Sequence, residues 1–164
     1  MPSTHVQRRV MHRPLDLLNL VADVEKYPEF VDLITALRTS QRRQISESVE
    51  TFEAEVNINY KFVSEIFKSH VTVDRGENRI FVKKSGKGGA VRKLENIWHF
   101  QELPDGSTLV DFEVTVSLKA FPLNVLLRDK FDKAGAHIMK LFIVRAGKKL
   151  ETVGDPELDV KAPA

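Results

Sequence analysis

The sequence predicts an α+β fold in which a curved antiparallel sheet holds one long C-terminal helix. Three observations support this prediction. The N-terminal part contains one strand and two short helical segments, the middle of the chain alternates apolar and polar residues, and the last part returns to a helical period. Half-polar strands need a cover on one face only, and the apolar stripe of the C-terminal helix is the long cover that the sequence offers.

The first strand and the first helix follow each other closely. Residues 4–12 alternate loosely around Val6 and Val10, which predicts a strand. Pro14 suits the first turn of a helix, and apolar residues then recur at helical spacing up to about Val24.

A second short helix is predicted after the first. Pro28 disfavours helical geometry at Tyr27, so the first helix ends before this pair. Pro28 is then expected to open a new helix with Phe30, Leu33 and Ile34 on its apolar side. The stretch is interpreted as a joint between two helices that cap one end of the sheet, with Phe30 directed toward the core.

About six consecutive antiparallel strands are predicted from Ile34 to Leu118. The clearest strand covers residues 51–60, where every second residue is apolar: Phe52, Ala54, Val56, Ile58 and Tyr60. The segment Pro104-Asp105-Gly106 is typical of a hairpin turn between the last two strands. Each of these strands is expected to have one face toward the core and one toward water.

The C-terminal helix is predicted from about Leu123 to Leu150. One stripe along it carries the apolar residues Leu123, Leu127, Phe131, Ala134, Ile138, Leu141 and Phe142. Basic residues gather near its end, where cations interact favourably with the helix dipole. Residues 1–150 are therefore predicted to form a single domain, and residues 151–164 a disordered tail with little to bury.

Composition excludes some classes of protein. The 164 residues suit one domain, the formal net charge is only +2, and the absence of cysteine excludes disulfides and thiolate chemistry. The first residues lack the apolar core of a signal peptide, and no stretch approaches the roughly 20 apolar residues that span a bilayer. We expect a cytoplasmic protein, with peripheral contact at the inner face of the cytoplasmic membrane as an option.

The sequence does not predict a metal site or a catalytic site. The five histidines are His5, His12, His70, His99 and His137, and none has metal-ligand spacing. No phosphate-binding or nucleophile motif is present. The strand alternation directs the carboxylates of Glu53, Glu55, Asp111 and Glu113 to the polar faces. His137, at the edge of the helical stripe, is the one candidate base, and a structural role is preferred for it.

Large apolar side chains face inward instead. Those considered for ligand contact, with the polar Tyr60 among them, are Phe30, Phe52, Val56, Tyr60, Phe67, Trp98, Phe112, Leu127, Phe131, Ile138 and Phe142. Val114, Ser69 and Asn96 are also expected on this side, and Trp98 or Tyr60 offers a donor to a ligand's head group. Apolar walls with few polar anchors are typical of ligand pockets. A filled core without a cavity fits the same residues.

A basic run is predicted at the tip of a hairpin. Five cations occur within eleven residues that contain no acid: Lys83, Lys84, Lys87, Arg92 and Lys93. Such a run is often a solvated loop. It also suits contact with anionic lipid, at about 1 kcal/mol per residue near the surface, or with ribosomal RNA. No aromatic RNA-binding motif accompanies it, and no DNA contact is expected.

Three segments resemble a known family. Leu20 to Glu25 with Tyr27 to Phe30, then Phe67 to Val71, and then Leu94 to Phe100 are similar to motifs of the coenzyme Q-binding family. This family lies in the START-like, polyketide cyclase-like superfamily and includes bacterial ribosome-association toxins. The resemblance covers roughly Thr4 to Leu150 and implies a helix-grip fold.

The resemblance also implies a function. It favours a non-catalytic carrier or chaperone that binds an isoprenoid quinone, ubiquinone, as a ligand and supports respiration. No cofactor is expected beyond that ligand. The alternative is a regulator that binds a ribosomal subunit and blocks subunit association. A cyclase-type enzyme ranks last, because the sequence offers no acid–base pair in the cavity.

Overall fold

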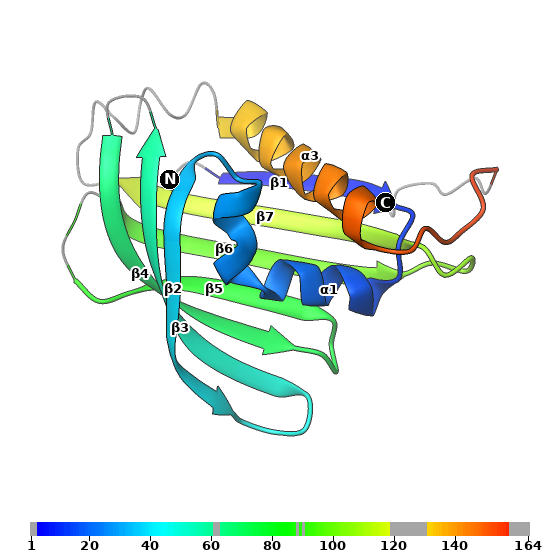
Figure 1. Ribbon diagram of the computed structural model, residues 1–164, viewed down its shortest axis with the longest axis horizontal. Coiled ribbons are helices and arrows are strands. Elements are labelled where there is room, and N and C mark those ends of the chain that lie inside the picture. Colours follow the sequence, from blue (N-terminus) through cyan, green and yellow to red (C-terminus); the bar gives the residue numbers. More distant parts are fainter. Residues whose placement is uncertain (1–2, 61–62, 88, 90, 119–130, 158–164) are drawn as a thin grey trace.

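The computed structural model describes residues 3–60, 63–87, 89, 91–118 and 131–157. These residues form one seven-stranded sheet, two α-helices and one 3-10 helix (Figure 1). The strands are β1 (Ser3–Val10), β2 (Ile34–Gln44), β3 (Val49–Tyr60), β4 (Val63–Asp74), β5 (Arg79–Ser85), β6 (Val91–Glu102) and β7 (Thr108–Leu118). The helices are α1 (Pro14–Ala22), η1 (Val24–Glu29) and α3 (Phe131–Lys149).

The sheet is antiparallel and follows the chain closely. Its order is β1-β7-β6-β5-β4-β3-β2, so β2 to β7 pair in sequence and β1 joins the far edge beside β7. In this register Phe52 lies opposite Val71, and Trp98 lies opposite Phe112. Directly opposed residues share a face, and Val82 links the two pairs, because it lies opposite both Val71 and Asn96, the inward residue two positions before Trp98. All four side chains therefore point to the same side. The six consecutive strands and the fold class predicted from the sequence are confirmed.

Both α-helices lie on the concave side of the curved sheet (Figure 1). Helix α3 packs along β1, while α1 packs against β5 and β6 and touches α3. The approach of α3 to β1 is close, because a Cβ atom added at Gly135 would lie 2.7 Å from Cγ2 of Thr4. The long helix is described from Phe131 onward, and its predicted beginning at Leu123 lies outside the described residues.

The second helix differs from its prediction. It is the 3-10 helix η1, which contains Pro28 and ends at Glu29, so the predicted helix over Phe30, Leu33 and Ile34 is wrong. Pro28 has no N–H with which to continue an α-helical ladder. The N–H groups of Phe30 and Val31 both donate to the carbonyl of Tyr27, at 3.1 and 2.8 Å, and close the segment in a tight turn.

Residues 151–157 lie against the N-terminal segment, although composition alone predicts disorder for the tail. The N–H of Val153 donates to the carbonyl of Met11 at 2.9 Å, and the ring of His12 contacts the carbonyl of Glu151 at 2.9 Å. Hydrogen bonds, rather than apolar burial, hold this part of the tail. Residues 158–164 lie outside the described residues.

Asp105, in the β6–β7 turn, anchors the same segment. Its carboxylate accepts hydrogen bonds from the hydroxyl of Ser107 at 2.5 Å and from the N–H of Asp155 at 2.7 Å, and it pairs with Arg9. The Ser107 hydrogen bond, followed by the Asp155 bond and the Arg9 charge, lowers the pKa of Asp105 well below its ordinary value of 3.8. The carboxylate is therefore stabilised in its charged form.

Asp105→Asn is expected to lower the melting temperature at pH 7 and to make residues 151–157 more accessible to protease. Because the native pKa lies below the unfolded value, the carboxylate stabilises the fold above pH 3.8, and this contribution is lost as pH falls through the native pKa. Melting curves at several pH values should show the difference between the two proteins shrinking below pH 3.8. A difference that does not change with pH would contradict this assignment.

Candidate functional site

The inward-facing side chains pass from buried to half-buried along every central strand. On β6, Phe100 and Trp98 are 1% and 3% exposed, whereas Asn96 and Leu94 are half-buried. The same change occurs between Val71 and Phe67, between Val56 and Ile58, between Ile80 and Val82, and between Phe112 and Val114. One end of the concave face is therefore closed. At the other end Ile58, Phe67, Val82, Leu94 and Val114 form a partly accessible apolar surface, which we call the inner patch.

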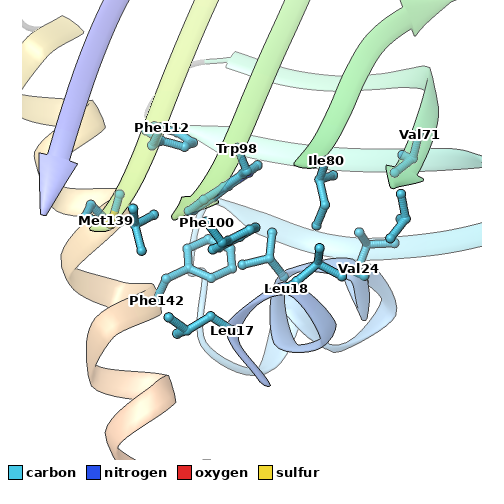
Figure 2. Close-up of a cluster of buried hydrophobic side chains, with 14 of the residues drawn as sticks. Leu17, Leu18, Val24, Val71, Ile80, Trp98, Phe100, Phe112, Met139 and Phe142 are labelled. Carbon is cyan, nitrogen blue, oxygen red and sulfur yellow. The ribbon is translucent and has the colours of Figure 1, made fainter. Parts of the chain in front are cut away.

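Aromatic side chains fill the closed end. The ring centroid of Trp98 lies 4.5 Å from that of Phe112 and 4.9 Å from that of Phe142 (Figure 2). Helix α1 adds Leu18, which is fully buried. The space left between these side chains measures about 10 Å³, which is room for roughly one water molecule. The filled-core alternative is therefore right for this end of the concave face.

Helix η1 is joined to α3 beside the inner patch. The ring of Phe142 lies edge-to-face with those of Phe30 and Tyr27, at centroid distances of 5.0 and 5.2 Å. Arg145 lies over the Phe30 ring at 5.0 Å and donates to the carboxylate of Glu29 at 2.8 Å. This hydrogen bond and the Arg145 charge lower the pKa of Glu29 below its ordinary value. Phe30 packs at this joint and keeps part of its surface accessible.

The polar side chains of the concave face include Ser69, Lys84 and Asn96. Ser69 on β4 lies directly opposite Lys84 on β5, and Asn96 on β6 lies directly opposite Val82 on β5. Since Ser69 is buried on the inner side, its partner Lys84 shares that side. Lys84 donates to the carbonyl of Gly86 at 3.3 Å.

The structure brings the described ligand candidates to one side of the sheet. Those in the closed core are Phe52, Val56, Trp98, Phe112 and Phe142, whereas Phe30, Phe67 and Ile138 are half-buried. Leu127 and the side chains of Tyr60 and Phe131 lie outside the described residues. Contact of any of these residues with a ligand stays a prediction.

Sequence reasoning missed two inward residues. Val82 and Lys84 follow Ile80 at a spacing of two on β5, and this alternation was the available signal. The run of cations instead predicts that Lys84 lies with its neighbours at a basic hairpin tip. The high density of lysines in this segment hid the fact that alternate residues of a strand face opposite sides.

The predicted basic tip is therefore smaller than five charges. Lys83 lies across the strands from Glu95, and the ammonium of Lys93 lies 3.6 Å from the same carboxylate. Lys87 and Arg92 are exposed. Glu95, two residues beyond the run, partly neutralises it, so Lys87 and Arg92 are the best remaining candidates for contact with an anionic surface.

The side chains considered for acid–base catalysis lie away from the concave face. His137 is exposed on α3, and Asp111 on β7 accepts hydrogen bonds from His5 and Gln7 on the outer face of the sheet. Across the described ranges, histidines and carboxylates do not gather into a group that would hold a metal ion. Within the same ranges, no helix has the length and apolarity needed to cross a membrane.

A larger hollow lies outside the concave face, at the end near the β6–β7 turn. Its volume is about 390 Å³, and its lining includes Arg13, Leu15, Asn78 and Glu102. Exposed and charged side chains form much of this lining, and Arg13 pairs with Glu151 at 3.1 Å. The hollow is separate from the inner patch, which has the apolar character expected of a lipid site.

The curved antiparallel sheet around a C-terminal helix is the helix-grip arrangement of START-like proteins. The sequence narrows this class further. Residues 10–139 match the family described as polyketide cyclase/dehydrase and lipid transport, and the chain belongs to this family.

Individual relatives agree with this assignment. The ribosome association toxin RatA of Pseudomonas aeruginosa is 23% identical over 88% of this chain and 96% of its own length. A START superfamily protein from Mycobacterium smegmatis superposes with a TM-score of 0.75 at 19% identity, over 89% of this chain and 97% of that one. An 18 kDa protein from Caulobacter crescentus has a TM-score of 0.72 at 29% identity, over 90% and 97% of the two chains.

Proposed function

We propose that this protein is a non-catalytic carrier that binds an isoprenoid quinone, such as ubiquinone, and supports respiratory electron transport. The observation that carries the proposal is the inner patch, where apolar side chains of five neighbouring strands stay half-buried beside a solid core. An isoprenoid chain is apolar and would cover such a surface. The family's description includes lipid transport, and the resemblance of Leu20 to Phe30 to coenzyme Q-binding proteins favours a quinone.

A carrier needs no acid or base at the ligand, whereas a cyclase does. His137, the candidate base, lies on the exposed side of α3. The strand alternation places Glu53 and Glu55 on the face of β3 opposite to the buried Phe52 and Ala54. These positions support a binding role rather than a catalytic one.

Titration with decylubiquinone tests the proposal, because Trp98 is the single tryptophan of the chain. It lies on the same face of β6 as Asn96 and Leu94, two and four residues away. A bound quinone ring close to an indole should quench its fluorescence, so quenching is expected to saturate at one quinone per protein. Free N-acetyltryptophanamide is the control for collisional quenching. Linear quenching equal to that of the control would reject the proposal.

A regulator that binds a ribosomal subunit is the second candidate, favoured by the relative named as a ribosome association toxin. Lys87 and Arg92 supply exposed charge for either RNA or anionic lipid. Sedimentation with ribosomal subunits distinguishes the candidates. Cosedimentation that is lost at high salt and in a Lys87→Glu/Arg92→Glu variant would favour the regulator. Salt-sensitive binding to anionic vesicles, without cosedimentation, would favour the carrier.

A further inference from the structure

We infer that Ser69, Lys84 and Asn96 form a head-group subsite for an amphipathic ligand whose polar end carries hydrogen-bond acceptor oxygens. This inference rests on the proposed function and deepens it, because it assigns the orientation and the polar chemistry of the ligand. The acceptor oxygens would be the ring carbonyls of a quinone or the carboxylate of a fatty acid. The sequence alone assigns Lys84 to a basic hairpin tip and the donor role to Trp98 or Tyr60.

The strand register places the three side chains together. Lys84 is the direct cross-strand partner of Ser69, and such pairs have Cβ atoms about 4.5–5.5 Å apart. Asn96 pairs with Val82, two residues before Lys84, so Asn96 and Lys84 are diagonal neighbours at about 7–8 Å. The side chains therefore come from three adjacent strands and are within reach of one small head group.

The hydroxyl of Ser69 is the strongest evidence for a ligand at this position. Ser69 is 2% exposed, and its hydroxyl makes no hydrogen bond to the rest of the described chain. Every fully buried side-chain nitrogen or oxygen in the described residues has a partner, so this hydroxyl must keep a small accessible area. Because Ser69 faces inward, that area opens on the concave face. A donor left there without a partner is costly, and a ligand oxygen would satisfy it.

Lys84 and Asn96 provide the remaining donors. Only one hydrogen bond of the Lys84 ammonium, to the carbonyl of Gly86, is formed within the described residues, and an ammonium has three donors. The Asn96 amide donates to the carbonyl of Glu113 at 3.0 Å and has a second N–H. Glu65, the inward acid on β4, is four residues from Ser69, and its carboxylate lies beside Gly89 of the β5–β6 loop, where a Cβ atom added at Gly89 would lie 2.6 Å from Oε1. A positive, donor-rich subsite attracts acceptor oxygens.

The same arrangement fixes the direction of the ligand. Beyond Asn96 the closed end is filled, with about 10 Å³ left beside Trp98. A chain attached to the head group must therefore extend the other way, along Phe67 and Ile58 of the inner patch. The head lies deep and the apolar tail leads toward the accessible end.

Three probes distinguish the contribution of the head group to binding from that of the tail. Decylubiquinone offers ring carbonyls, myristate offers a carboxylate, and 1-phenyldecane has a decyl tail on a ring without oxygen. Quinone binding is read from Trp98 quenching, and the affinities of the other two from their competition with the quinone. Lys84→Met removes the charge and donors at similar length, Ser69→Ala removes the hydroxyl, and Lys83→Met is the matched control on the outer face.

Wild type is expected to bind decylubiquinone more tightly than phenyldecane. Lys84→Met should weaken binding of the quinone, of myristate, or of both, by about tenfold, which corresponds to ~1.4 kcal/mol. Selective loss for one probe identifies its head group as the one recognised. Ser69→Ala should weaken the same probe several-fold, Lys84→Arg should restore most of its affinity, and phenyldecane should change less than twofold in every variant.

Two results would overturn the subsite. One is equal wild-type affinity for decylubiquinone and phenyldecane, and the other is an equal effect of Lys84→Met and Lys83→Met on folded proteins with matching melting curves. In both cases the protein still binds quinone, so the proposed function survives without this subsite. If wild type binds none of the three probes, the proposed function itself fails and the subsite fails with it.

Discussion

Met139→Lys is expected to unfold the protein, whereas Ile138→Lys is expected to leave it folded and without ligand. These neighbours lie about 100° apart around α3. Met139 is 2% exposed in the closed core, while Ile138 is half-buried and lies seven residues from Arg145, on the side of the helix that faces η1. One substitution therefore tests the solid part of the interior and the other tests the accessible part.

The two variants differ in the surroundings of the new ammonium group. At position 139 it would be surrounded by apolar side chains, and an unpaired buried charge costs several kcal/mol, a large part of the roughly 5–15 kcal/mol that stabilise a domain. At position 138 the lysine stem can lie along the inner patch with its charge toward the accessible end. It would then occupy the place of the ligand's tail.

Circular dichroism melting and decylubiquinone titration, made on both variants, check this pair of outcomes. If Ile138→Lys unfolds as completely as Met139→Lys, there is no accessible space beside α3 and the site is misplaced. If Ile138→Lys stays folded and binds quinone with wild-type affinity, the ligand does not pass along this side of the helix.

Phe142→Ala is expected to lower the free energy of unfolding by about 3–5 kcal/mol, the usual cost of truncating a packed aromatic residue. Phe142 is 6% exposed and its ring contacts those of Trp98, Tyr27 and Phe30. It thus connects α3 to the sheet and to η1 at once. Val144→Ala on the exposed face of the same helix is the control, since Val144 is 49% exposed.

Urea denaturation of both variants gives the comparison, with Val144→Ala expected within about 0.5 kcal/mol of wild type. A small effect of Phe142→Ala would mean that the neighbouring rings close the gap by repacking. The aromatic cluster would then not be the element that joins η1 to α3.

Most of the fold follows from the period of the sequence. Alternation placed Phe52 and Phe112 on the inner side and Glu53 and Glu113 on the outer side, because a one-residue shift of a strand reverses both of its faces. The residue types near Pro28 do not decide the local structure, because proline is compatible both with the first turn of an α-helix and with the 3-10 helix that is observed. The turn at Tyr27 depends on hydrogen bonds that residue types alone do not specify.

The candidate site could be predicted only in part. Inward direction was readable for Phe67 and Trp98, but the division between a filled end and an accessible end depends on how α1 covers the sheet. The inward direction of Lys84 follows from its spacing of two from Val82 and Ile80, but the sequence alone does not show that Lys84 lies opposite Ser69 on the neighbouring strand. Contacts of residues 151–157 likewise depend on Asp105, about fifty positions away.

The most direct test of the account is mass spectrometry of lipids extracted with organic solvent from the purified protein. We expect an isoprenoid quinone in near-stoichiometric amount from wild type, and its absence from folded Ile138→Lys prepared in parallel. A wild-type extract without quinone, or equal quinone in both preparations, would contradict the claim that the inner patch holds this ligand.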